Sequence, residues 1–260
     1  MRMGFSHIKF ELVDHVARLT LNRPEVLNAF NVAMQGEIFE AFQSLMDQDH
    51  VKCLVITGAG RAFCTGQDLE ERRVPDGAAM PDLGESLKQR YNPIITQIKA
   101  FDFPVICAVN GAAVGGGAGF ALACDIVVAA KSASFLLPFN KLGLIPDAGS
   151  TWSLPRALGL PRAKAAVLLS EKIPAPLAEE WGMIWKCVED DQLAQTVEGY
   201  VQQILPQPRT GMALSKKAFS MSLQNSLEEQ LLLESHYQSE AGANPEYRDR
   251  VMAFLNRKKS

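Results

Sequence analysis

The sequence predicts an α/β protein whose C-terminal part is entirely helical. Short apolar runs rich in β-branched residues alternate with helical patterns up to Asp190. Three of these runs lead directly into glycine-bearing loops, and every segment after Asp190 has a helical character. We therefore expect a core domain over residues 1–200 and a helical region over residues 201–260, with no low-complexity linker between them.

The composition argues against a polyanion-binding or membrane protein. Of the 260 residues, 47% are hydrophobic, which suffices for a substantial core, and the net charge is -3 with both signs interspersed. No apolar run approaches the roughly 20 residues of a membrane span. The first ten residues lack the apolar core of a signal peptide, so we expect a cytoplasmic protein that binds neither membranes nor nucleic acid.

The five cysteines and four histidines are scattered along the chain. Neither set has the spacing of a disulfide framework or of a zinc site. We therefore expect no metal centre.

The first half of the chain begins with an alternating apolar and polar pattern on both sides of Asp14-His15, which predicts a β-hairpin. Asn31 is placed to cap a helix that buries Met34 and Ile38 on one face and runs to about Asp49. The other elements expected here are strands at 51–57 and 105–109, an irregular charged segment at 70–85 and a helix at about 84–99.

The second half is divided by glycine and proline into shorter elements. The expected strands are 126–129, 134–137 and 183–188, and the expected helices are 151–158, 161–170, one ending at Trp181-Gly182, 193–205, 211–220, 227–239 and 245–256.

Three glycine-bearing loops follow expected strands, at residues 60–69, 110–120 and 142–152. The middle loop carries the cluster GGGAG at 115–119 and then enters a helix. Glycine lets another group approach the backbone closely, and unpaired amides at a helix N-terminus can stabilise an oxyanion. Close packing of a helix on a sheet would explain the same glycines. Phe120 occupies the third glycine of a dinucleotide-binding fingerprint, and no P-loop is present.

Three further motifs occur in a fixed order along the chain. They are Asn22-Arg23-Pro24 with Leu27-Asn28-Ala29, the loop Phe63-Cys64-x-Gly66-x-Asp68-Leu69, and Ala108-Val109-Asn110-Gly111 with the glycine cluster and Cys124-Asp125. This set resembles the enoyl-CoA hydratase/isomerase (crotonase) superfamily over essentially the whole chain. The segments 81–93, 140–156 and 179–188 are most similar to the bacterial ring-1,2-epoxyphenylacetyl-CoA isomerases of phenylacetate degradation.

The resemblance implies a crotonase-like spiral of ββα repeats with a C-terminal helical region that mediates trimers or hexamers. It also implies an acyl-CoA thioester as substrate, with no cofactor besides the CoA that the substrate carries. A hydratase of the same pathway is a further partner to be expected.

The catalytic residues implied by the resemblance are two backbone amides and one carboxylate. The amides of Gln67 and Gly116 would hold the thioester oxygen. Hydratases of the superfamily carry two glutamates, and their positions are occupied here by Gly119 and Phe139. Asp147 lies where several isomerases carry their acidic residue, and burial would raise its pKa. The alternative role of Asp147 is a helix N-cap.

Substrate-binding positions also follow from the resemblance. The expected residues are Arg23, Leu27, Arg61, Phe63, Asp68, Leu69, Phe139, Phe254 and Lys258. The arginines would meet the phosphates of CoA, although lone arginines are usually solvated. Phe254 and Lys258 would reach the CoA of a neighbouring subunit. For Asp68, structural anchoring of its loop is the stronger alternative.

The predicted function is therefore that of an acyl-CoA isomerase. On the resemblance, it would convert 2-(1,2-epoxy-1,2-dihydrophenyl)acetyl-CoA to oxepin-CoA and would also shift a Δ3 double bond to Δ2. The alternatives are an enoyl-CoA hydratase and a non-catalytic binding protein on the same fold. The acidic balance and the lack of a basic stripe argue against an RNA-binding role.

Overall fold

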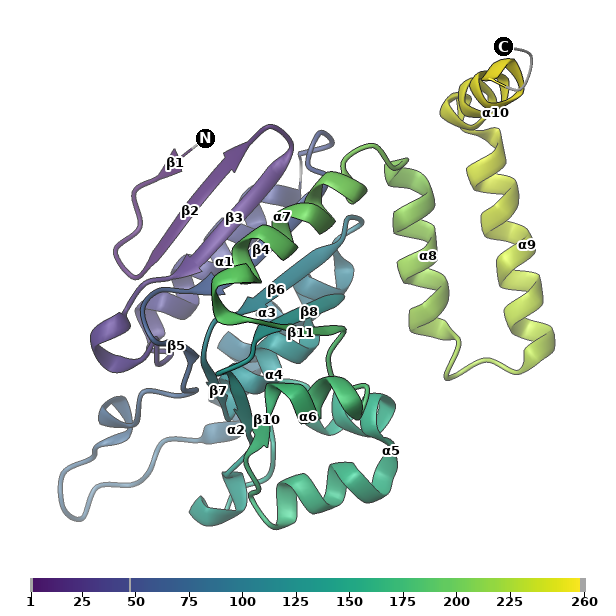
Figure 1. Cartoon of the computed structure of the whole chain (residues 1–260). Coiled ribbons are helices and arrows are strands. Elements are labelled where there is room, and N and C mark those ends of the chain that lie inside the picture. Colours follow the sequence, from purple (N-terminus) through teal and green to yellow (C-terminus); the bar gives the residue numbers. More distant parts are fainter. Residues whose placement is uncertain (1, 47, 258–260) are drawn as a thin grey trace.

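The computed structural model describes residues 2–46 and 48–257, and over these residues it contains two β-sheets surrounded by helices (Figure 1). The larger sheet has seven strands in the order β1 (Arg2–Met3), β2 (Ile8–Val13), β3 (Val16–Leu21), β4 (Cys53–Gly58), β6 (Val105–Val109), β8 (Ile126–Ala130) and β11 (Lys186–Val188). The smaller sheet has the order β10 (Ile173–Pro174), β9 (Ser134–Leu136), β7 (Ala112–Val114) and β5 (Ala62–Cys64).

The predicted hairpin is confirmed, because β2 and β3 pair antiparallel with Ile8 opposite Leu21. From β3 onward the larger sheet is parallel, through β4, β6, β8 and β11. Every residue of β6 is buried, which explains why this strand reads as a continuous apolar run instead of an alternating one.

The smaller sheet turns the chain into a spiral of ββα repeats. Each of β4, β6 and β8 is followed by a short strand of the smaller sheet, and helices then lead the chain back to the larger one; after β9 this return passes through α5, β10 and α6. This confirms the predicted spiral. The sequence did not predict β5 and β7, because their residues lie within segments that were expected as glycine-bearing loops, and it did not predict the two-residue strand β10.

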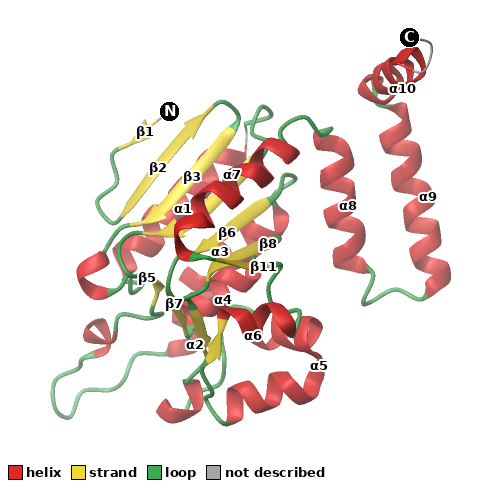
Figure 2. Ribbon diagram, viewed as in Figure 1, coloured by secondary structure: helices red, strands yellow, loops and turns green. Residues whose placement is uncertain are grey.

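The helices cover the sheets and extend beyond them (Figure 2). They are α1 (Val32–Met46), α2 (Leu83–Ser86), α3 (Asn92–Ala100), α4 (Gly116–Ala123), α5 (Ser150–Leu168), α6 (Ala175–Glu180), α7 (Leu193–Ile204), α8 (Arg209–Met221), α9 (Leu227–Ala243) and α10 (Pro245–Arg257). Short 3-10 helices occupy Pro24–Val26, Leu69–Arg72, Phe139–Leu142 and Asp190–Gln192. No helix within the described ranges is both long and apolar enough to cross a bilayer.

Local signals in the sequence account for several helix boundaries. The Asn31 side chain accepts a hydrogen bond from the Met34 amide at 2.8 Å, which confirms the predicted cap of α1. Two helices were expected over residues 151–170, and α5 is kinked between them at Gly159, where φ is 73°. The helix expected at 84–99 is confirmed as a continuous helical stretch over residues 83–100, and a π-helical turn at Leu87–Tyr91, which was not expected, lies between α2 and α3.

The last three helices extend away from the sheets (Figure 1). Only α8 is joined to the core by described ion pairs, Arg209 to Asp102 and Lys216 to Asp125, both at 2.6 Å. In contrast, α7 packs against β6 and β8. The Lys216 pair shows that Asp125, whose carboxylate also accepts a hydrogen bond from the Val105 amide, joins elements of the fold.

Candidate active site

Two loops distant in sequence meet at the N-terminus of α4. Gly66 has φ of +84°, and a Cβ built on it would lie 2.8 Å from the carbonyl oxygen of Val114 and 3.2 Å from the amide nitrogen of Gly116. Such a short contact with backbone atoms leaves no room for a side chain. The loop after β5 and the start of α4 therefore pack backbone against backbone.

Because of this contact, the loop that carries Gln67 lies against the start of α4, where Gly116 is the first residue. The bridge between Phe30 and Gln67 uses the Phe30 amide, which donates to Gly66 at 2.7 Å, and the Asp68 amide, which donates to Phe30 at 2.9 Å. The Gln67 amide is outside this pattern. Gly116 is the first residue of α4, and the first amides of a helix have no partner within it. Two such donors can stabilise a developing oxyanion.

Asp147 places a carboxylate beside Gly116. Its Oδ1 atom is buried without a hydrogen-bond partner in the described part of the chain, and it lies 3.5 Å from a Cβ built on Gly116. The N-cap interpretation of Asp147 was wrong, because the N-cap of α5 is Gly149. Asp147 takes part there only through its backbone carbonyl, which accepts from the Ser150 amide at 2.9 Å.

Burial raises the pKa of Asp147 from 3.8 to about 6, although its own backbone amide and the positive charge of Arg72 oppose the rise. A carboxyl group with a pKa in this range holds a proton weakly enough to return it and strongly enough to accept it. The side chain is therefore suited to proton transfer near neutral pH.

Tyr91 completes this arrangement, and sequence reasoning missed it. Its ring carbon Cε1 lies 3.2 Å from the Cβ position of Gly116, and its hydroxyl donates to Gln67 Oε1 at 3.0 Å. Arg72 donates to the same oxygen at 3.2 Å. Burial raises the pKa of Tyr91 well above its ordinary value, so the phenol stays neutral. No sequence signal points to this role, because Tyr91 belongs to an apolar stripe that looks like an ordinary buried face.

Phe139 lies at the edge of the same site. Its ring atom Cζ is 3.8 Å from a Cβ built on Gly115, and its side chain is buried. An aromatic ring therefore stands beside the N-terminus of α4, where its contact with substrate stays a prediction.

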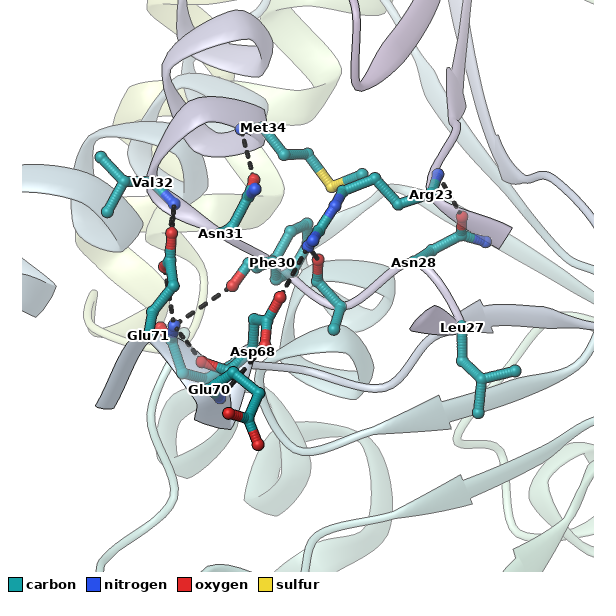
Figure 3. Close-up of polar contacts among 12 residues, drawn as sticks. Arg23, Leu27, Asn28, Phe30, Asn31, Val32, Met34, Asp68, Glu70 and Glu71 are labelled. Carbon is teal, nitrogen blue, oxygen red and sulfur yellow. Dashed lines mark hydrogen bonds and ion pairs between the residues drawn. The ribbon is translucent and has the colours of Figure 1, made fainter. Parts of the chain in front are cut away.

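Arg23 and Asp68 form an ion pair that links the loop carrying Gln67 to the segment that follows β3 (Figure 3). The Arg23 guanidinium donates from Nη1 to Asp68 at 2.9 Å and to the Ala29 carbonyl at 2.7 Å. Asp68 also caps the following 3-10 helix by accepting from the Glu70 amide at 3.2 Å. These contacts give Arg23 and Asp68 an anchoring role, while their contact with substrate stays a prediction.

Asn28 explains the motif that follows Arg23. The side chain is fully buried, and its amide nitrogen donates to the carbonyl oxygens of Ala59, Ala62 and Phe63. Its own oxygen accepts from the Arg23 amide at 2.9 Å. One buried amide thus binds the first motif to the loop that leads to Gln67.

The other expected binding residues are dispersed. Phe63 lies in the hydrophobic core and stacks on Phe120 with ring centroids 6.3 Å apart. The remaining ones are the half-buried Leu27, the exposed Arg61 and Leu69, and the exposed Phe254 on α10, which Figure 1 shows well away from α4. Lys258 lies outside the described residues. The structure thus brings Gln67, Gly116, Asp147 and Phe139 together, and it leaves the CoA-binding roles as predictions.

Replacing Asp68 with asparagine should destabilise the protein by about 3 kcal/mol, because Arg23 would be left as a buried, unpaired cation. The side chains of this pair are only 15% and 14% exposed. The measurement is a urea unfolding curve. Glu70→Gln is the matched control, since its ion pair with Arg73 is highly exposed and such pairs contribute little. A stable Asp68→Asn protein that had lost only its turnover would contradict the anchoring role.

Comparison with known proteins identifies the family of this chain. Residues 11–260 match the family described as Enoyl-CoA hydratase/isomerase. The chain is 47% identical over 255 residues to the 1,2-epoxyphenylacetyl-CoA isomerase of Escherichia coli (strain K12), which covers 98% of this chain and 96% of that protein. It is 41% identical over 257 residues to a Rhodobacter capsulatus protein named "Probable enoyl-CoA hydratase", with 98% and 97% covered. A solved enoyl-CoA hydratase/isomerase from Cupriavidus metallidurans CH34 has a TM-score of 0.91 at 27% identity, covering 98% of this chain and 95% of that one.

Proposed function

Because the chain belongs to the enoyl-CoA hydratase/isomerase family, we propose that it is an acyl-CoA isomerase that moves a double bond by carrying one proton on Asp147. The observation that supports this most is the buried Oδ1 of Asp147, unpaired within the described residues and beside Gly116. The positions of the two hydratase glutamates hold Gly119 and Phe139, so the carboxylate pair that would activate water is missing.

In the proposed reaction the thioester oxygen accepts hydrogen bonds from the amides of Gln67 and Gly116. The Asp147 carboxylate removes a proton from the carbon next to the thioester, and the electrons of that C–H bond move onto the oxygen as an enolate. Asp147 then returns the proton to the carbon at the far end of the conjugated system, and the double bond forms next to the thioester. No atom is added or lost. Each preorganised donor stabilises the developing oxyanion by about 3 kcal/mol.

The proposed substrate is 2-(1,2-epoxy-1,2-dihydrophenyl)acetyl-CoA, which would rearrange to oxepin-CoA. The Escherichia coli relative, at 47% identity, supports this choice through the activity in its name. Opening of the ring would follow from the substrate's own electrons once the proton has been removed. The chemistry needs no cofactor besides the CoA of the substrate, and we expect a Δ3 to Δ2 enoyl-CoA isomerase activity by the same proton path.

Hydration is the alternative that the Rhodobacter capsulatus relative favours through its name. The side chains at the site argue against it, because Asp147 is the one carboxylate that we place beside the two amides. The aromatic rings of Tyr91 and Phe139, close to the N-terminus of α4, would also keep water from the enolate.

The experiment that tests the proposal is incubation of the purified protein with a 3-enoyl-CoA in heavy water, followed by mass spectrometry of the product. We expect the 2-enoyl isomer without the mass of an added water. A product heavier by one water would make the protein a hydratase and would overturn the proposal. If the 3-enoyl-CoA does not react, the epoxide is the decisive substrate, and no turnover of either compound would reject the isomerase assignment.

The pH dependence gives a further prediction. Asp147 must be ionised to accept a proton, and its pKa is raised to about 6. The value of kcat/KM should therefore fall tenfold per pH unit below about 6 and level off above it. Initial rates between pH 4.5 and 8 measure this limb. An acidic limb near 4, the ordinary value for a solvated aspartate, would show that the buried Asp147 is not the base.

We also propose that residues 201–260 mediate a homotrimer or hexamer. In support, α9 buries none of its residues in a single chain, and Phe219, Leu231 and Leu232 are 78%, 52% and 73% exposed. Burial of such side chains between subunits would be favourable. Light scattering coupled to gel filtration tests the proposal, and a monomer at micromolar concentration would contradict it.

A further inference from the structure

The turn that carries Asp147 is seated directly on Gly119 of α4. A Cβ built on Gly119 would lie 2.7 Å from Ser150 Oγ and 2.8 Å from both the Cβ and the carbonyl oxygen of Ala148. Real side chains do not approach so closely, and one of the three atoms belongs to the backbone, so rotation of a side chain would not relieve the contact. Ala148 and Ser150 are almost fully buried, so they cannot move outward without disturbing the residues that cover them.

The backbone of this turn is unusual. Ala148 has φ of 48° and Gly149 has φ of 76°, so two successive residues adopt the left-handed conformation. For alanine this conformation is strained, and strained residues persist where the surrounding structure holds them. The contact of Ala148 with α4 supplies such a restraint on the residue that directly follows Asp147.

The contact on Gly119 and the position of the carboxylate are linked through one face of α4. Residues 116 and 119 lie three positions apart and therefore face the same side of the helix. Ala148 and Ser150 meet that face at Gly119, and Asp147 Oδ1 meets it at Gly116. We propose that Gly119 is the positioning residue for Asp147, because only a residue without a side chain lets the turn sit close enough to hold the Asp147 carboxylate beside Gly116.

This inference rests on the proposed function and deepens it. Gly119 touches no reacting atom in the scheme. Any side chain there would push the turn outward by several tenths of an ångström, since ordinary contacts begin near 3.4 Å. A side chain at position 119 and a correctly placed Asp147 thus exclude each other in this chain.

The first test is Gly119→Ala. Because misplacement of a catalytic group by about 1 Å can cost 100-fold in rate, we expect kcat to fall by about 10- to 100-fold. We also expect the acidic limb of the pH profile to move from near pH 6 toward pH 4, because a displaced carboxyl is better solvated. Gly36→Ala is the control, since this glycine also lies within a helix and a Cβ there would meet nothing within 4 Å.

The second test is rescue. Adding Ala148→Gly and Ser150→Ala to Gly119→Ala removes two of the three colliding atoms, and it should return part of kcat and move the limb back toward pH 6. The same pair of substitutions should restore folding if Gly119→Ala alone does not fold. A folded Gly119→Ala protein with wild-type kcat, or with a lower kcat and an unmoved limb, would overturn the proposal. Failure of the rescue would overturn it too.

The third readout does not require turnover, so it separates this inference from the assigned reaction. The melting temperature at pH 8 is compared among wild type, Asp147→Asn, Gly119→Ala and the double variant. If Gly119→Ala folds only together with Ala148→Gly and Ser150→Ala, these two turn substitutions are present in all four proteins that are compared. We expect the gain in melting temperature from Asp147→Asn to shrink to less than half once Gly119 carries a side chain, because the displaced carboxylate is then less buried. An undiminished gain would refute the positioning role even in a protein that isomerises nothing.

Discussion

Replacing Asp147 with asparagine should lower kcat for double-bond isomerisation by about 10²- to 10⁴-fold, the usual contribution of a general acid–base group. Asparagine has nearly the same shape, but it cannot take a proton from the carbon next to the thioester. The amides of Gln67 and Gly116 remain, so the KM for the acyl-CoA should change little. The measurement is the initial rate with a 3-enoyl-CoA. Turnover within threefold of wild type would show that the proton moves by another route.

The same substitution should make the protein more stable above pH 6. The pKa of Asp147 is raised from 3.8 to about 6, so the folded protein holds this proton more tightly than the unfolded chain. The associated stability is fully present below about pH 4 and is lost as the pH rises through 6. Above that pH the buried charge costs roughly 2 to 3 kcal/mol, which Asp147→Asn would recover.

Urea unfolding at pH 4 and pH 8 measures this effect, with a clear gain expected only at pH 8. The result also serves as the folding control for the inactive variant, because a less active and more stable protein has not lost its structure. A loss of stability at pH 8 would indicate that the carboxylate has a favourable partner and is not a buried, unpaired charge.

Gly117→Ala should cause the second large effect. A Cβ on Gly117 would lie 2.3 Å from the carbonyl oxygen of Cys64 and 2.9 Å from its carbonyl carbon, so α4 and β5 would have to separate. Overpacking against backbone atoms typically costs 1–3 kcal/mol and sometimes more, and we expect about 3 kcal/mol here. Turnover should fall as well, because α4 carries the Gly116 amide and β5 leads to Gln67.

Gly199→Ala is the matched control for Gly117→Ala. Gly199 lies in the exposed part of α7, and a Cβ there would meet nothing within 4 Å. Alanine is the better helix former, so this variant should be about 0.5–1 kcal/mol more stable than wild type. Urea unfolding curves of both variants and of wild type measure these differences in stability. Equal stability of the two would mean that α4 and β5 can move apart without cost.

The sequence was most informative where a signal is local. Asn31 caps α1 through a bond that depends on neighbouring residues only, and the apolar run at 105–109 forms the buried strand β6 as expected. The π-helical turn at Leu87–Tyr91 was missed, because an inserted residue changes the register of a helix without changing its composition.

The candidate site shows the same division. Its glycines and Asp147 could be singled out from motif order and resemblance. Tyr91 could not be singled out, because its hydroxyl donates a hydrogen bond to Gln67, which lies 24 residues away in the sequence. Nothing in the sequence around residue 91 distinguishes it from an aromatic residue of the core.

By itself, the sequence determined the α/β class and, through its resemblance, the ββα spiral, and it singled out Asp147 as the candidate carboxylate. Only the tertiary structure decided that the Oδ1 atom of this carboxylate has no hydrogen-bond partner among the described residues, that burial raises its pKa, and that Gly119 and Gly117 are both contact points of α4 with other segments. The physical reason is that periodicity and capping act between near neighbours, whereas desolvation and close packing depend on atoms brought together from distant parts of the chain.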